Sequence, residues 1–370
     1  MAQFLLILLY IFIGIVVIQV IYYFFIFGKF SFAKPQESTA KHVSVSVIVC
    51  AKNEEENVKN FIPLLANQNY SNFEIILIDD ASSDETLEIF EQFEKQYTNV
   101  KLVKVANNEA FWGNKKFALT LGIKAATKDY LLFTDADCYP NSENWITEIS
   151  SHFTLHKTIV LGYGAYEKEP SFLNKLIRFE TLVTATQYFA WAKLGRPYMG
   201  VGRNLGYKKD EFFKVNGFIN HMKLRSGDDD LFINEAANKH NIAIAYNPES
   251  FTYSKAKKTF KDWIMQKRRH VSTAKHYKSF DKTQLGFFYF SQLFFLLIPI
   301  VLLAFQFQWI IVTSMIAFRY LIAWISLGYS AGKLKEKDVI YWFPVLEIIL
   351  IFTQLNVFIR NIFSKPVTWK

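Results

Sequence analysis

Apolar residues are concentrated at the two ends of the chain. Residues 4–27 contain no Asp, Glu, Lys or Arg, and at about 1.5 Å per residue a helix of that length crosses a hydrocarbon core of roughly 30 Å. Three more apolar runs occupy residues 285–305, 309–329 and 339–359. The pattern predicts a transmembrane anchor over residues 1–28 and a C-terminal membrane region over 285–360 with two to three transmembrane helices.

Between these ends, apolar runs of strand length alternate with amphipathic segments of helix length. Helices are predicted after Asn53, which we expect to act as a cap, after the capping box Ser82–Glu85, and over 115–127 and 171–194. Such alternation predicts an α/β domain, placed at residues 43–254, whose mostly parallel sheet is covered on both faces. The predicted strands are 43–50, 73–78, 100–105 and 130–134.

Acidic residues follow two of the predicted strands. Asp79 and Asp80 end the second strand, and Asp135-Ala136-Asp137 ends the fourth. Ligands of such sheets bind beyond the carboxyl ends of the strands, and no Gly-x-Gly-x-x-Gly or Walker-type loop accompanies these acids, which disfavours dinucleotide and ATP chemistry. A lone Asp-x-Asp is usually a solvated turn, but here Asp135 and Asp137 can bind Mg²⁺ or Mn²⁺ together with substrate phosphates.

Lys115, Asp80 and the aspartates 228–230 also have the chemistry of a site for a phosphate ester. Lys115, at the start of a helix, can meet a diphosphate, and Asp80 can accept hydrogen bonds from a nucleobase. The aspartates 228–230 repel one another unless a cation or a proton is near. They form either a solvated acidic loop or a site in which one aspartate acts as a general base.

Charge and cysteine content narrow the class of protein. Cys50 and Cys138 are too few for a disulfide framework or a zinc site. The net charge of +9 comes largely from basic residues near apolar segments, so we expect anionic lipid headgroups as partners and no nucleic acid. Residues 255–284, basic and interleaved with aromatic side chains, are predicted to lie on the inner membrane face as an amphipathic segment.

The same charges predict a topology. Lys29 and Lys34 follow the first apolar segment and no Lys or Arg precedes it. By the positive-inside bias, the amino terminus is outside and the central domain is cytoplasmic, in a multi-pass protein of the cell membrane.

The last apolar run, residues 339–359, is ambiguous. A full span would place Arg360, Lys365 and Lys370 outside, against the bias, and the run contains Glu347, Gln354 and Asn356. It either spans with Glu347 packed against other helices or dips in and returns as a re-entrant or interfacial segment. We favour spanning.

The ordered motifs of the middle region resemble the membrane-bound family-2 glycosyltransferases, which include hyaluronan, cellulose and poly-N-acetylglucosamine synthases and ceramide glucosyltransferase. The resemblance covers residues 43–270 with membrane segments on both sides. It rests on Ala51-Lys52-Asn53-Glu54, Ile78-Asp79-Asp80-Ala81-Ser82, Lys115, Asp135-Ala136-Asp137, the acidic cluster and Gln266-Lys267-Arg268-Arg269-His270.

The resemblance implies a GT-A fold, a nucleotide-diphosphate sugar donor (commonly UDP-linked) and a divalent metal. It implies that Asp80 contacts the nucleobase, that Asp137 binds the metal, and that Asp229, favoured over Asp228 and Asp230, activates the acceptor. The other implied residues are Ala51, Asn53, Glu54, Lys115 and Asp135 for the donor, and Gly202, Gln266, Arg269 and His270 for the acceptor and membrane side.

Two departures from the family pattern affect the expected product. Lys52 stands where an aromatic residue often stacks on the base, and His270 stands where the polymer synthases have a tryptophan under the acceptor sugar. We therefore favour an inverting, metal-dependent hexosyltransferase that adds one sugar to a lipid-linked or saccharide acceptor. The alternatives are a processive polysaccharide synthase and an inactive membrane-anchored scaffold with the same fold.

Overall fold

The computed structural model describes residues 1–34, 43–106, 115–224 and 226–364, which exclude Lys365 and Lys370 of the topology argument. The described chain forms two compact units. The sheet unit comprises the described residues of 43–169 and 195–257, and the helical unit comprises 1–34, 170–194 and 258–364. The predicted helix at 171–194 exists as α7 (Phe172–Lys193) but belongs to the helical unit, whereas the sequence placed it within one domain over 43–254.

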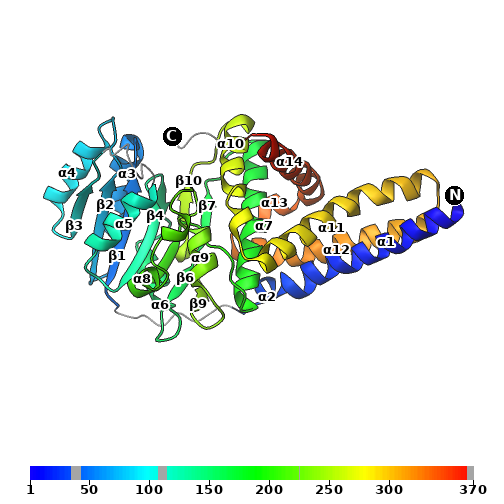
Figure 1. Cartoon of the computed structure of the whole chain (residues 1–370), viewed down its shortest axis with the longest axis horizontal. Coiled ribbons are helices and arrows are strands. Elements are labelled where there is room, and N and C mark those ends of the chain that lie inside the picture. The colour runs from blue at the N-terminus through cyan, green and yellow to red at the C-terminus, as the bar shows by residue number, and fades with distance from the viewer. Residues whose placement is uncertain (35–42, 107–114, 225, 365–370) are drawn as a thin grey trace. The chain divides into compact units, whose positions relative to one another are not determined.

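The sheet unit is built on a seven-stranded mixed sheet (Figure 1). The four predicted strands exist and are parallel neighbours, whereas β8 (Leu205–Lys208) runs antiparallel to both β4 (Tyr130–Asp135) and β6 (Ile159–Leu161). In spatial order the strands are β3 (Val100–Lys104), β2 (Phe73–Asp79), β1 (Val45–Ala51), β4 (Tyr130–Asp135), β8 (Leu205–Lys208), β6 (Ile159–Leu161) and β9 (Ile242–Ile244).

The β-branched and apolar residues of β1 and its neighbours explain why these strands are central. Val47, Val49, Leu77 and Leu132 are at most 1% exposed and belong to one core cluster, as expected for strands that are covered on both faces. The helices of this unit are α3 (Glu55–Ala66), α4 (Thr86–Gln96), α5 (Lys115–Ala125), α6 (Trp145–Ser151), α8 (Lys209–Lys214) and α9 (Asp230–Ala236).

Both predicted caps that flank the first two helices are wrong. Helix α3 begins at Glu55 with Glu54 at the cap position, and Asn53 has φ 55°. Its side-chain oxygen accepts a hydrogen bond from the Ser83 N–H at 2.8 Å. Asn53 therefore joins two loops instead of capping a helix.

The expected capping box before α4 is replaced by a second loop-to-loop contact. Helix α4 begins at Thr86, and Glu85 at its cap position makes no side-chain cap. The Asp84 carboxylate instead accepts from the Glu55 N–H at 3.2 Å and from the Thr86 N–H at 3.1 Å. These bonds tie the loops after β1 and β2 together at one edge of the sheet.

A small second sheet completes this unit. It has the order β5 (Cys138–Pro140), β10 (Thr252–Ser254) and β7 (Gly164–Tyr166). These strands have three residues each, too few to give a hydrophobic period in the sequence.

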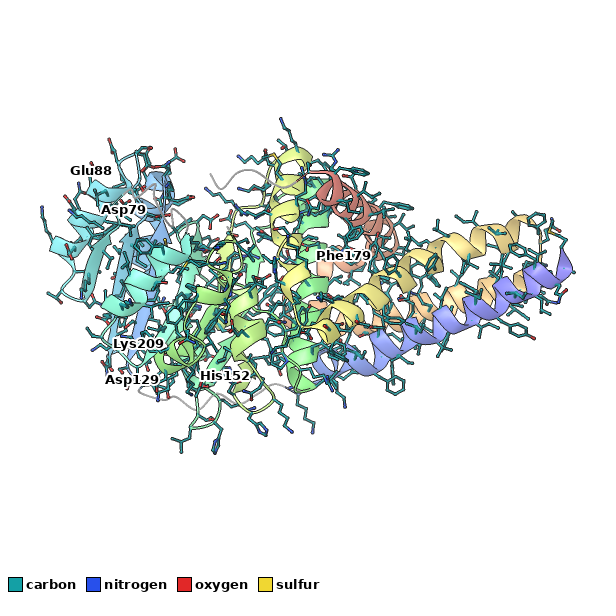
Figure 2. All side chains as sticks on the ribbon, in the orientation of Figure 1. Asp79, Glu88, Asp129, His152, Phe179 and Lys209 are labelled. Carbon is teal, nitrogen blue, oxygen red and sulfur yellow. The ribbon has the colours of Figure 1, made fainter. Side chains whose placement is uncertain are left out.

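The helical unit contains four helices that are long and apolar enough to cross a membrane. Three of them lie side by side (Figure 1), namely α1 (Ala2–Val20), α11 (Ser279–Ala304) and α12 (Trp309–Lys333). A core that includes Phe12, Phe295 and Leu302 holds them together, and many apolar side chains project away from the three helices (Figure 2). The elements are α1 (Ala2–Val20), a π-helical turn (Ile21–Ile26), α2 (Gly28–Ser31), α7, α10 (Phe260–Val271), α11 (Ser279–Ala304), α12 (Trp309–Lys333), α13 (Lys337–Ile340) and α14 (Phe343–Phe363).

Candidate active site

The predicted acidic residues of the sheet unit meet at the carboxyl ends of the parallel strands. In the register of the sheet, Cys50 pairs with both Ile78 and Asp135, and Ala51 pairs with Asp79. The ends of β1, β2 and β4 are therefore level. This is the edge at which open α/β sheets bind ligands.

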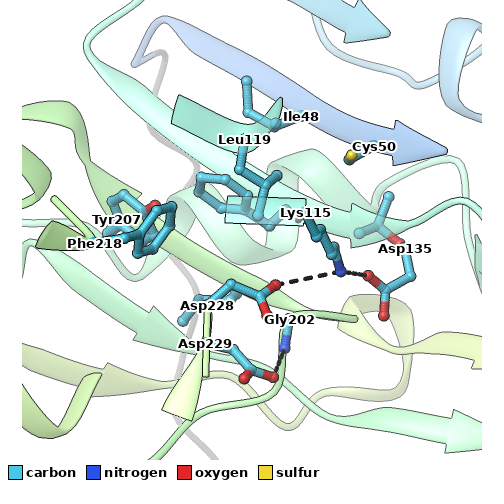
Figure 3. Close-up of a pocket in the computed structure, with 13 residues that line it drawn as sticks. Ile48, Cys50, Lys115, Leu119, Asp135, Gly202, Tyr207, Phe218, Asp228 and Asp229 are labelled. Carbon is cyan, nitrogen blue, oxygen red and sulfur yellow. Dashed lines mark hydrogen bonds and ion pairs between the residues drawn. The ribbon is translucent and has the colours of Figure 1, made fainter. Parts of the chain in front are cut away.

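Lys115 is the cation at the centre of a pocket (Figure 3). Its Nζ lies 2.5 Å from Asp135 Oδ1 and 3.3 Å from Asp228 Oδ2. Burial disfavours the charged amine, but Asp135 and Asp228 raise the pKa of Lys115 well above its ordinary value. Lys115 therefore remains a cation in the pocket, where it can neutralise an anionic group.

Asp229 lines the same pocket from the loop before α9. Its carboxylate accepts hydrogen bonds from the Gly202 N–H and from the Asp230 N–H, both at 2.7 Å. Burial, with the charges of Asp228 and Asp230, raises the pKa of Asp229 to about 7. A carboxylate with this pKa can accept a proton near neutral pH.

Asp228 differs from its neighbour because Lys115 faces it. Burial by itself raises the pKa of Asp228, but the charges of Lys115 and Lys116 and the hydrogen bonds to the carboxylate together outweigh that effect and hold the pKa below its ordinary value. Asp228 is therefore the weaker base of the two. Asp230 is buried, and its side chain accepts from the Leu231 N–H at 2.7 Å.

Asp135 and Asp137 form the candidate metal site, together with the neighbouring Cys138. One ligand atom from each residue lies within 4.8 Å of the others. Burial, followed by the charges of Asp135 and Glu54, raises the pKa of Asp137, and the charge of Arg203 offsets this effect only in part. Burial also raises the pKa of the Cys138 thiol well above its ordinary value. The available donors are thus carboxylate oxygens, which suit Mg²⁺ or Mn²⁺.

The predicted donor-binding residues differ in how free their side chains are. Asn53 bonds to Ser83, and Glu54 accepts a hydrogen bond from Asn57 at 2.7 Å. Both therefore stabilise the loop that follows Ala51, the last residue of β1. Asp80 is 7% exposed, and burial raises its pKa. The adjacent Asp79 Oδ1 is buried and has no hydrogen-bond partner among the described residues. Asp79 Oδ1 is therefore a hydrogen-bond acceptor that an N–H or O–H group of a bound nucleotide sugar could satisfy.

Two cations at the site, one partly buried and one fully buried, were not predicted. The guanidinium of Arg203 lies 4.3 Å from the centre of the Tyr166 ring, donates to Ser254 at 3.0 Å, and is close enough to Asp135 and Asp137 for their charges to raise its pKa. The sequence did contain a signal for Arg203, because it follows Gly202 in a Gly-rich stretch.

Lys116 is the second unpredicted cation. It is 1% exposed, and its Nζ donates to the carbonyls of His221, Leu224 and Ser226 at 2.8, 3.1 and 2.7 Å. These carbonyls precede the acidic cluster, so Lys116 holds the loop that carries Asp229. The sequence gives no signal for this role, because surface lysines are far more common.

Gln266, Arg269 and His270 are on α10, in the helical unit. Gln266 and Arg269 are partly exposed and His270 is exposed. They are not among the residues that line the pocket of the sheet unit. Their predicted role at the acceptor side stays a prediction.

Comparisons with known proteins agree with this geometry. Residues 46–225 match the model of glycosyl transferase family 2. The poly(ribitol-phosphate) beta-glucosyltransferase of Bacillus spizizenii is 26% identical over 56% of this chain and 35% of that protein. The 4,4'-diaponeurosporenoate glycosyltransferase of Staphylococcus haemolyticus is 26% identical over 51% of this chain and 50% of that protein. The chain thus spans half or less of the length of these two relatives.

A solved structure extends the likeness to most of the chain. The mannosyltransferase PcManGT from Pyrobaculum calidifontis, in complex with GDP-Man and Mn²⁺, matches with a TM-score of 0.58 and 14% identity over 95% of this chain and 98% of that one. At this identity the match concerns the fold, and it confirms the GT-A prediction. The match to the model of glycosyl transferase family 2 covers residues 46–225, just under half of the chain.

Proposed function

We propose that the protein transfers a sugar from a nucleotide-diphosphate sugar to a hydroxyl group of a lipid-linked or saccharide acceptor, with inversion at the anomeric carbon. The observation that carries this proposal is the pocket in which Asp229, with a pKa of about 7, lies beside the Lys115–Asp135–Asp228 group. It combines a base for the acceptor with a cation for the leaving diphosphate.

Asp229 is the proposed general base. As the acceptor oxygen bonds to the anomeric carbon, the Asp229 carboxylate takes the hydroxyl proton, and the bond from that carbon to the diphosphate oxygen breaks. The hydrogen bonds from the N–H groups of Gly202 and Asp230 fix the orientation of the carboxylate. Asp228 suits this role less well because its pair with Lys115 lowers its basicity.

Negative charge that develops on the leaving diphosphate is the second requirement. The Lys115 ammonium can turn from Asp135 to a phosphate oxygen, since it bonds to Asp135 through a single flexible amine. Asp135 and Asp137 would hold a divalent cation, which supplies further stabilisation of that charge when bound. Preorganised charge of this kind is usually the largest single contribution to catalysis.

The names of the similar proteins suggest the classes of the sugar donor and of the acceptor. PcManGT was solved with GDP-Man, and the two relatives act, by their names, on poly(ribitol-phosphate) and on 4,4'-diaponeurosporenoate. We propose a nucleotide-sugar donor, with UDP first, and an acceptor at the membrane surface. The long apolar helices α1, α11 and α12 support a membrane location, and the lysines at 29 and 34 support a cytoplasmic sheet unit.

The test is nucleotide release by the full chain in detergent, with a panel of UDP- and GDP-sugars, in the presence of Mn²⁺ or of EDTA. Release from one donor that requires the metal and is lost in Asp229→Asn supports the proposal. A chain that binds nucleotide sugars but releases no nucleotide with any acceptor lipid or glycan would support the scaffold alternative.

Product length separates single transfer from chain extension. His270 in place of the tryptophan of the polymer synthases supports single transfer, so we expect mass spectrometry to find one added sugar. A ladder of oligosaccharides from the wild-type protein would overturn single transfer and leave the glycosyltransferase proposal standing. His270→Trp should fold normally, because residue 270 is exposed.

A further inference from the structure

The segment before α14 is held by α7. The Arg178 guanidinium on α7 donates to Glu336 Oε2 through Nε at 2.9 Å and to Asp338 Oδ2 through Nη1 at 2.8 Å. Arg178 and Glu336 are both 2% exposed. Phe179 is the next residue on α7 (labelled in Figure 2), and its ring packs 5.9 Å from that of Phe343, the first residue of α14. The N-terminal flank of α14 is therefore fixed to α7.

The segment after α14 is held by α10. The Arg268 Nε donates to Asn361 Oδ1 at 3.0 Å, and its Nη2 donates to the Ser364 carbonyl at 2.7 Å. Asn361 returns a hydrogen bond from Nδ2 to the Arg268 carbonyl at 3.0 Å. The C-terminal end of α14 is thus bound to a helix that precedes α11 in the chain.

Helices α7 and α10 are themselves joined. Lys267 Nζ on α10 lies 2.5 Å from Glu180 Oε2 on α7. Lys267 is adjacent to Arg268, and Glu180 is one turn or less from Arg178. One pair of linked helices therefore holds both flanks of α14.

Helices α7 and α10 lie at one end of the bundle of α1, α11 and α12. It is the end at which the chain connects to the sheet unit. On α7, the Phe189 ring lies 5.0 Å from that of Phe30, at the end of the first membrane segment. The Trp191 ring lies 5.7 Å from that of Phe280, in the first turn of α11. At the last residue of α12, Lys333 donates to the Ala33 carbonyl.

Between its flanks, α14 reaches into the bundle. Glu347 bonds to Arg319 of α12, which lies about 21 Å from Lys333 along that helix at 1.5 Å per residue. Beyond this contact Gln354 and Asn356 are exposed. Exposed amides are unfavourable in a hydrocarbon core and are tolerated in the headgroup region. In Figure 1, α14 is inclined to α1, α11 and α12 and does not run parallel to them.

We infer that α14 does not cross the membrane but enters it from the side of the sheet unit and returns to that side. Only α1, α11 and α12 then span, and α14 with α10 forms a surface for the lipid headgroup layer. The exposed apolar side chains that would face this layer are Val345, Ile348, Phe352, Phe358, Ile359 and Ile362 on α14 and Phe260 and Met265 on α10. This arrangement removes the conflict with the positive-inside bias, because Arg360 then stays on the side of Lys29 and Lys333.

The test is side-specific labelling of single added cysteines by a membrane-impermeant maleimide, in sealed vesicles of either orientation. Tyr341→Cys and Ser364→Cys report the two flanks of α14. Leu155→Cys, in the sheet unit, and Ala304→Cys, at the opposite end of α11, are the references, and all four positions are exposed. The wild-type chain gives the background from Cys50 and Cys138, and labelling in detergent gives the full reactivity of each site.

We expect both flanks to be labelled from the same face as Leu155→Cys and opposite to Ala304→Cys. Labelling of Tyr341→Cys and Ser364→Cys from opposite faces would overturn the inference and establish a fourth span. A nitroxide scan over the exposed positions of α14 gives a second criterion. Depth should decline from the level of Glu347 toward residue 362, whereas a crossing helix would be deepest near its middle and shallow at both ends.

Discussion

Each unit of the protein buries a cluster of charged side chains, and the two clusters are balanced differently. In the helical unit, Arg319 and Glu347 are 0% and 2% exposed and pair at 2.7 Å. Gln19 accepts from the guanidinium at 2.6 Å, and the Tyr23 hydroxyl donates to the carboxylate at 2.9 Å. One cation meets one anion, and neutral groups satisfy the remaining hydrogen bonds.

In the sheet unit the anions outnumber the cations. Asp135, Asp137, Asp228, Asp229 and Asp230 lie near Lys115, Lys116 and Arg203. Burial, together with this excess of negative charge, raises the pKa values of Asp137 and Asp229, which means that the folded protein resists their ionisation.

The difference indicates which cluster binds a ligand. The Arg319–Glu347 pair is balanced in charge and fully hydrogen-bonded. It stabilises the packing of α14 on α12 and offers no unpaired group that a ligand could bind. A cluster with excess negative charge is unfavourable alone and becomes favourable when a cation or a proton from a substrate enters. Removing an acid should therefore cost activity in the sheet unit and stability in the helical unit.

The largest expected effect is that of Asp137→Ala, which should lower nucleotide release by about 10³-fold or more, because a metal site contributes several kcal/mol to stabilising the leaving group. The melting temperature should change little, since the residue lies at a strand end outside the core. Asp129→Ala, at an exposed position of the same unit, is the control. Near-normal turnover of Asp137→Ala with metal present would remove the metal assignment.

Asp229→Asn should lower turnover by about 10²–10⁴-fold, the range of a positioned acid–base group. The amide oxygen can keep one of the two hydrogen bonds, from Gly202 or from Asp230, which bond to different oxygens of the carboxylate. Lys116 still holds the loop through its carbonyls, so the loop should keep its structure. Donor binding, measured by calorimetry with the nucleotide sugar, should be nearly unchanged. An equal loss of donor binding would assign the acidic cluster to the donor site.

Arg319→Ala should lower the free energy of unfolding by about 3–5 kcal/mol, because it leaves Glu347 buried without its partner. Chemical unfolding in detergent micelles measures the change. The double variant Arg319→Met with Glu347→Leu removes both charges and should recover most of the lost stability. If Arg319→Ala unfolds like the wild type but loses turnover, the two clusters do not differ in the way that we describe.

Features of the fold and of the site were predictable from the sequence where they depend on neighbouring residues, and not where they depend on contacts between residues far apart in the chain. The central strands were predictable because each is a local run of apolar residues, and Asp135 and Asp137 because they directly follow such a run. The strands β5 to β10 were not, because three or four residues give no period and their pairing is set by distant partners.

The same limit applies to the clusters. Glu347 stood out as an acid in an apolar run, but its partner Arg319 is revealed only by packing. Lys116 acts on carbonyls roughly a hundred residues further along the chain, a distance at which local patterns carry no information. Helix α7 was predicted from its pattern, whereas its place in the helical unit depends on the partners that it packs against.

The smallest expected effect is the pH dependence of the acceptor step. Asp229 must be ionised to accept a proton, and its pKa is about 7 against an ordinary value near 4. Below pH 7, kcat/KM should therefore fall about tenfold per pH unit, and above it the rate should level off. Stability should change in the opposite sense. Between about pH 4 and 7 the folded state holds a proton that the unfolded state has lost, so the free energy of unfolding falls as pH rises through this window. Asp229→Asn cannot titrate at this position and should show a smaller slope than the wild type, because Asp80 and Asp137 keep their raised pKa values. Arg319→Met with Glu347→Leu should keep the full slope, since that pair lies in the other unit. A slope that is unchanged in Asp229→Asn would assign the titration to other groups and weaken the contrast between the clusters.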